Sequence, residues 1–138
     1  MSDVLLIFHF IGLMLGAGGG LGSTVAMGYA NSLSETKAKA VRGLGPVFAH
    51  VSLAGLVVLW VTGVVLLFTR YSIGAMPVMF WFKIGFTLLL SFAVVSIEMT
   101  HARVKAGDAK AALLLPSLGP MAGLSSLMAV IFAVLAFH

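Results

Sequence analysis

Four long apolar runs, separated by short polar segments, organise the chain of 138 residues. A helix needs about 20 apolar residues to cross the hydrocarbon core of a bilayer. Apolar residues are continuous within each run rather than alternating, which excludes the strands of a membrane barrel. The pattern predicts an all-α integral membrane four-helix bundle that forms a single transmembrane domain over residues 1–138. The predicted spans are about 4–30, 43–69, 78–102 and 112–137.

Glycine and proline mark the ends of these runs. Pro46 is suited to the first turn of the second helix, because the N–H groups of that turn have no acceptor within the helix. The segment 71–77 is predicted to be a turn, and Gly107 is expected to break the third connection. Pro116 and Pro120 lie early in the fourth run and should mark its start or kink it.

Composition supports membrane insertion and excludes several other classes. Hydrophobic residues make up 61% of the chain and charged residues only 9%, and the mean hydropathy is +1.16. A soluble domain with this composition would expose large apolar patches to water. The net charge of +4 arises from few residues near the run ends, so we expect a lipid bilayer rather than nucleic acid as the partner. Cysteine is absent, which excludes disulfides and thiolate metal sites.

The distribution of Lys and Arg predicts the orientation. The first and third connections hold Lys37, Lys39, Arg42, Arg103, Lys105 and Lys110, which are six of the eight basic residues. The other side holds only Arg70 and Lys83. Because cytoplasmic loops are enriched in basic residues, both termini are predicted on the non-cytoplasmic side. The localisation that follows is multi-pass in a bacterial inner membrane.

Ionisable side chains inside the apolar runs carry the functional signal, because each costs a few kcal/mol at the bilayer centre. The third run places Lys83, Thr87, Ser91, Val94, Glu98 and His101 at steps of three and four residues, on one face of one helix. Such a stripe is expected to face the bundle interior. These polar side chains either make interhelical hydrogen bonds only, or line a cofactor site, a proton path or an ion path.

Histidines on three different spans suggest cofactor ligands. His50 should lie about 10 Å from the cytoplasmic face, near the level of His101, and His9 should lie in the opposite leaflet. Inward imidazoles are the usual ligands of haem iron in helical bundles, and Arg70 is suited to a haem propionate. We therefore predict haem b, with His9, His50, His101 and Arg70 as cofactor-binding residues. The same three histidines are the predicted metal ligands, and the alternative for each is a bond to a backbone carbonyl.

Glu98 and Lys83 are the predicted catalytic residues. Glu98 and His101 form a Glu-x-x-His pair, as found in di-iron bundles, but Glu35 is the only other glutamate and lies in a connection. Glu98 is therefore expected to accept a hydrogen bond from a histidine or to accept a proton. Pairing with Arg103 or Arg42 is the structural alternative.

Glycines Gly12, Gly16 and Gly20 share a helix face with His9. This spacing allows close helix packing, and it would also leave room for a flat cofactor. A faint repeat aligns Gly45-Pro46 with Gly119-Pro120 and would relate the two halves of the chain as parallel hairpins.

The chain resembles the HemJ-type protoporphyrinogen oxidases and the related CopD-like small four-helix membrane proteins. The resemblance rests on Phe8-His9-Phe10-Ile11-Gly12, on the basic first connection and on Phe80-Trp81-Phe82-Lys83. It implies a b-type haem protein that oxidises a porphyrinogen or passes electrons to quinone, with His9 and Lys83 as functional residues. Departures are the glycine-rich segment 16–20, where the family has tryptophan, and Leu114-Leu115-Pro116, where it has Asn-Glu before the proline.

The leading hypothesis is a haem b-binding membrane oxidoreductase or electron-transfer protein, with porphyrinogen oxidation as one such activity. A CopD-like metal or ion permease, with His9, Glu98 and His101 as a relay, is the first alternative. The second is a non-catalytic subunit of a respiratory or photosynthetic complex, or a homo-oligomer. Whether the protein is an enzyme stays open at this point.

Overall fold

The structure, a computed structural model, describes residues 2–70, 74 and 76–137. Its helices are α1 (Ser2–Ala30), α2 (Glu35–Arg42), α3 (Gly45–Arg70), α4 (Val78–Lys105), the 3-10 helix η2 (Ala109–Leu114) and α5 (Leu115–Phe137). No strand occurs among the described residues. Four segments are helical, long and apolar enough to cross a membrane. The predicted all-α architecture is therefore confirmed, together with four helices that are long and apolar enough to span a membrane.

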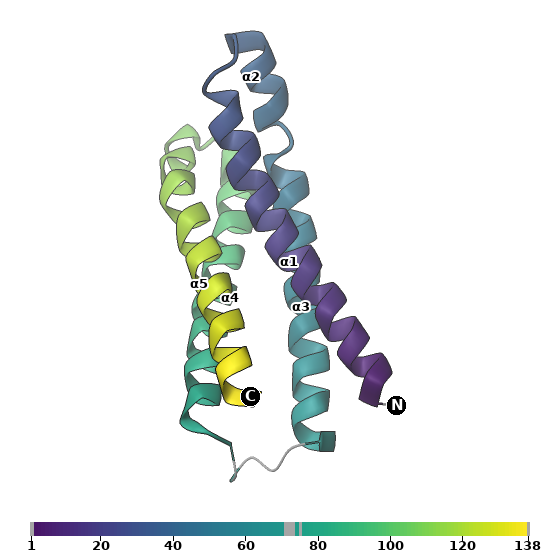
Figure 1. Ribbon diagram of the computed structural model, residues 1–138. Helices are drawn as coiled ribbons and strands as arrows, with labels where there is room; N and C mark the ends of the chain where they lie inside the picture. The colour runs from purple at the N-terminus through teal and green to yellow at the C-terminus, as the bar shows by residue number, and fades with distance from the viewer. Residues whose placement is uncertain (1, 71–73, 75, 138) are drawn as a thin grey trace.

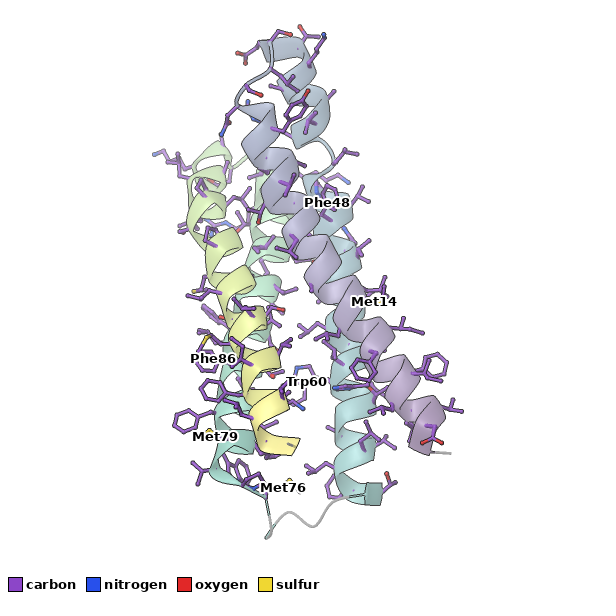
Figure 2. The ribbon with its side chains drawn as sticks, viewed as in Figure 1. Met14, Phe48, Trp60, Met76, Met79 and Phe86 are labelled. Carbon is purple, nitrogen blue, oxygen red and sulfur yellow. The ribbon has the colours of Figure 1, made fainter. Side chains whose placement is uncertain are left out.

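The long helices α1, α3 and α5 are largely apolar on all sides, as helices surrounded by lipid should be. Large apolar side chains point away from the protein, among them Met14, which is 73% exposed, and Phe68, which is 71% exposed; Met14 lies on the outer side of α1 in Figure 2. The buried positions are mostly small, including Ala49 and Ala93. Small buried residues let helix backbones approach closely, which is how membrane helices associate without a hydrophobic driving force.

The helices form two hairpins (Figure 1). In the first hairpin α1 packs along α3, in the second α4 packs along α5, and α3 meets α4 over a smaller area. The N- and C-termini lie at one end of the bundle, which we call the terminal end, and α2 lies at the other, which we call the α2 end. The fold does not determine which end faces the cytoplasm. That orientation is inferred from the distribution of charged residues.

Glycines bring α1 and α3 into backbone contact. A Cβ added to Gly12 would lie 3.0 Å from the carbonyl oxygen of Gly55, and one added to Gly19 would lie 2.8 Å from that of Phe48. The Ser52 hydroxyl donates across this contact to the carbonyl of Gly16 at 3.2 Å. Helix packing thus accounts for Gly12, whereas a Cβ at Gly16 would make only ordinary contacts, the nearest at 3.9 Å. Gly20 has open space beside it instead.

The helix boundaries depart from the predicted spans at three places. The first connection contains α2, which was not predicted, and α4 continues to Lys105. The last run is divided, because α5 begins at Leu115 after the separate η2. Pro116 therefore marks a helix start, whereas Pro120 lies inside α5.

Two of the predicted helix-end signals are found in the structure. Pro46 is in the first turn of α3, as predicted. Gly107 lies two residues after the end of α4. Its φ of +104° is one that glycine alone adopts readily. Most of the predicted turn at 71–77 lies outside the described residues. The two Gly-Pro pairs of the proposed repeat differ in setting, since Pro46 starts its helix and Pro120 does not.

We predict that Gly55→Ala weakens the first hairpin. The added Cβ would meet the backbone of Gly16 and lie 2.7 Å from the Gly12 carbonyl oxygen, and backbone atoms cannot rotate away. Overpacking of this kind costs about 1–3 kcal/mol, measurable as the free energy of unfolding in mixed micelles. Gly18→Ala is the matched control, because nothing lies within 4 Å of its Cβ position. Equal stability of the two variants would contradict the packing described above.

We also predict an acid-dependent contact just beyond α4. Arg103 Nη2 donates to Asp108 Oδ2 at 2.7 Å, and this hydrogen bond holds the pKa of the Asp108 carboxyl below its ordinary value. The contact therefore stabilises the folded chain above the ordinary carboxyl pKa and is lost as the pH falls through the lowered one. A carboxyl-detected NMR titration should show this low midpoint. In Arg103→Gln the midpoint should rise toward the value of a free aspartate, while the backbone hydrogen bonds of Lys110 and Ala111 remain.

Candidate functional site

The polar face of α4 points toward α3. Its members Lys83, Thr87, Ser91, Glu98 and His101 are each partly buried, and Val94 is fully buried. Two of them bond directly to α3. Trp60 Nε1–H donates to Ser91 Oγ at 2.9 Å, and Glu98 bonds His50. Figure 2 shows Trp60 between the two hairpins. The predicted inward orientation of this face is thus what the structure shows.

The two hydroxyls in the middle of this face are satisfied within their own helix. Thr87 donates to the carbonyl of Lys83 at 2.8 Å, and Ser91 donates to the carbonyl of Thr87 at 2.7 Å. The Ser91 oxygen also accepts the hydrogen bond from Trp60 Nε1–H. The middle of the α3–α4 contact therefore holds one interhelical hydrogen bond.

A cluster of His50, Glu98 and His101 lies toward the α2 end. His50 Nε2 is 2.9 Å from Glu98 Oε1, and His50 Nδ1 donates to the Pro46 carbonyl at 2.6 Å. Glu98 thus has the histidine partner that was predicted. The alternative basic partners are occupied elsewhere, because Arg103 bonds Asp108 and Arg42 bonds Asn31.

His101 completes this cluster from the next turn of α4. A Cβ at Gly45 would lie 3.1 Å from His101 Cε1, so the imidazole rests against the start of α3. The charges of Glu98 and His50 both act on it. The structure therefore brings His50 and His101 to the same level of the bundle, as their depths in the sequence predicted.

A second cluster lies toward the terminal end and joins three helices. His9 of α1 bonds Thr62 of α3, with 2.8 Å between Nδ1 and Oγ1. Lys83 of α4 is near enough to act on His9 electrostatically, and its Nζ lies 5.8 Å from the centre of the Phe80 ring. Arg70 ends α3 at this end of the bundle, but its side chain lies outside the described residues.

Neither cluster is a ready-made metal site. Among the described residues no group of three or more His, Cys, Asp or Glu side chains is placed to hold a metal ion. Both ring nitrogens of His50 are in hydrogen bonds, so ligation by His50 would require it to release Glu98 or Pro46. His9 has a hydrogen bond assigned at Nδ1, which is the common arrangement for an imidazole that binds iron through Nε2.

An apolar cavity of about 490 Å³ lies between the hairpins, apart from both clusters. Gly16, Gly19 and Gly20 line it from α1, and Gly119 and Gly123 line it from α5. None of its lining residues is a histidine. The room that the glycine pattern predicted therefore exists, but it does not coincide with the imidazoles.

Sequence reasoning missed the contribution of α3 to both clusters. Trp60 and Thr62 supply the partners of Ser91 and His9, yet neither belongs to a polar stripe in the sequence. One tryptophan and one threonine in an apolar run are ordinary core residues. Only the packing of α3 against α1 and α4 gives them their roles.

Comparison with models of known protein families, with curated proteins and with solved structures gave no match for this chain.

We predict that Trp60 and Ser91 are energetically coupled. A double-mutant cycle of Trp60→Phe and Ser91→Ala isolates their hydrogen bond, and such bonds between membrane helices are worth about 0.6 kcal/mol, rarely above ~1.7 kcal/mol. Unfolding in mixed micelles gives the four free energies. The same cycle with Thr69→Ala should give no coupling, because the Thr69 hydroxyl bonds its own helix at Val65.

Proposed function

We propose that this protein is a membrane redox protein that binds haem b through His9. Electron transfer to quinone, or oxidation of a porphyrinogen, is the corresponding activity. The observation that carries the proposal is the hydrogen-bond arrangement around the His9 ring, argued next.

The Thr62 hydroxyl decides which nitrogen of His9 carries the proton. It donates its own hydrogen to the Val58 carbonyl at 2.6 Å, so toward His9 its oxygen acts as an acceptor. The bond of 2.8 Å then runs from Nδ1–H of His9 to Thr62. A neutral imidazole protonated at Nδ1 keeps its lone pair on Nε2. Ligand histidines are typically held in this way by a partner at the other nitrogen.

A haem at His9 would need fewer protein ligands than a bare metal ion, although the cavity between the hairpins does not reach His9. The porphyrin already gives haem iron four nitrogen ligands, and the protein supplies only axial ligands such as imidazole. A cluster of three protein ligands is therefore not needed. Lys83 is near enough to act on His9 electrostatically, and a lysine ammonium can bind a haem propionate. Bound haem would supply one-electron chemistry. The chain would orient the imidazole, balance charge through Lys83 and exclude water with its apolar helices.

The membrane topology of the proposal follows from the basic connections. Six of the eight Lys and Arg residues lie in the first and third connections, at the α2 end of the bundle. We propose that this end faces the cytoplasm, with both termini across a bacterial inner membrane. His9 would then act in the leaflet away from the cytoplasm. Quinone or porphyrin substrates would reach it from the lipid, with or without a further copy or a larger complex.

We predict that protein made with adequate haem supply shows a Soret band that depends on His9. His9→Ala should abolish the band, because it removes the proposed ligand. Thr62→Val should shift the band or the midpoint potential without removing the haem, since it removes only the partner of Nδ1. Visible absorption and redox titration of purified protein measure both effects.

His101→Ala is the matched control, since it removes an imidazole of similar burial from the other cluster. Its Soret band should equal that of the unchanged protein. Loss of the band in His101→Ala but not in His9→Ala would move the haem to the α2 end and overturn the assignment of His9. No band in any preparation would reject haem altogether.

A further inference from the structure

We propose that the apolar cavity between the hairpins binds one acyl chain of an anionic phospholipid from the leaflet at the α2 end. Such a site is independent of haem, because neither His9 nor its partners Thr62 and Lys83 line the cavity. The opening of the cavity, its length, its lining and the charges at its end all suit this ligand.

The cavity opens toward lipid between α1 and α5, which lie in front of α3 and α4 in Figure 1. All four long helices line it, but its exposed lining residues come only from α1 and α5. Leu21 and Leu124 are each 62% exposed, and Leu127 is 57% exposed. On α3 and α4 the lining residues, such as Ala49 and Val94, are buried or partly buried. A molecule dissolved in the bilayer can therefore enter sideways between Leu21 and Leu124.

The contact between α3 and α4 closes the opposite side of the cavity. Trp60 donates to Ser91, and His50 bonds Glu98, so two polar contacts join these helices. α1 and α5, by contrast, share far less surface with each other than either shares with its hairpin partner. Membrane helices associate through close packing, and here that packing is missing. A bound acyl chain would fill this gap between the hairpins.

The cavity extends through one leaflet. Its lining along α5 runs from Gly119 to Val130, which is about 16 Å at the rise of an α-helix. One leaflet contributes about 15 Å to the hydrocarbon core. Gly119 is one turn from the α2 end of its helix, and the lining of α1 begins at Gly16, in the middle of that helix. The cavity thus has the length of a chain that reaches from the α2 end to the centre of the bilayer.

The lining suits methylene groups. The described lining holds no charged side chain, and its polar side chains are three hydroxyls, those of Ser23, Ser52 and Ser126. The Ser52 hydroxyl already donates to the Gly16 carbonyl. Polar ligands without hydrogen-bond partners are costly to bury, whereas an acyl chain needs none. The volume of about 490 Å³ is within the usual range for ligand sites.

Positive charge at the α2 end favours an anionic headgroup. Lys110 is exposed on η2, which leads directly into α5 and packs against it. Arg103 and Arg42 at the same end are bonded to Asp108 and Asn31. A chain that enters beside α5 would bring its phosphate to the level at which this helix begins. Basic residues at the membrane surface attract anionic lipids, so we assign the headgroup to Lys110.

Native mass spectrometry of the full chain in detergent micelles, with added phosphatidylglycerol or phosphatidylcholine, tests the site. One phosphatidylglycerol should bind more tightly than any further lipid. Gly20→Leu fills the cavity from α1 without a clash, since nothing lies within 4 Å of the Cβ position, and should weaken this binding by about tenfold or more. Gly18→Leu is the matched control, because its Cβ position is equally open but outside the lining. Equal binding by the two variants overturns the site.

A second pair of variants and a stability measurement guard against misfolding. Gly123→Leu on α5 should weaken binding as Gly20→Leu does, whereas Gly85→Leu, also in open space but away from the cavity, should not. Ligands that bind the folded state raise Tm. Phosphatidylglycerol should therefore raise the Tm of the unchanged protein and of Gly85→Leu, but not that of Gly123→Leu. The same rise in all three proteins overturns the site.

Two further measurements separate the headgroup and the occupant. Lys110→Gln should reduce the preference for phosphatidylglycerol over phosphatidylcholine, and Lys37→Gln should not, because α2 packs on α1 rather than on α5. Equal binding of the two lipids to the unchanged protein overturns the anionic headgroup. Added haem should leave the bound lipid in place. Displacement of the lipid by haem would put a porphyrin in the cavity and overturn the acyl chain.

Discussion

The close backbone contact between α1 and α3 is the constraint on which the rest of the structure depends. In lipid no hydrophobic force drives helices together, so association relies on close packing and interhelical hydrogen bonds. Gly12 and Gly55 supply the close approach, and Ser52 adds a bond to the Gly16 carbonyl. This contact fixes the rotation of α1 relative to α3. The same rotation brings His9 to Thr62.

The contact between the hairpins is of a different kind. α3 and α4 share less surface than the helices within each hairpin, and their polar bonds are spaced along it. Trp60 bonds Ser91 near the middle, and His50 bonds Glu98 toward the α2 end. Polar side chains are costly in lipid unless they are paired. These pairs therefore set the register of the second hairpin against the first, and they place the two histidine clusters toward opposite ends of the bundle.

The departures from the HemJ-type pattern have a structural counterpart. Where that family has tryptophan, this chain has glycines at 16–20, of which Gly16, Gly19 and Gly20 line the apolar cavity. Tryptophans could not occupy positions such as Gly19, whose Cβ site is already crowded by Phe48 and Ser52. The proposed haem site at His9 lies outside this glycine region.

The apolar runs alone determined that the chain forms four helices long and apolar enough to span a membrane, because a chain in lipid must bond its backbone groups within a helix. The three-and-four spacing from Lys83 to His101 also determined the inward face of α4, since helix geometry is local. The partners could not be predicted in this way. Thr62 and Trp60 are unremarkable in the sequence, and the short α2 and the separate η2 depend on how the connections close. Hydrogen bonds between helices depend on rotation and register, and only tertiary packing decides those.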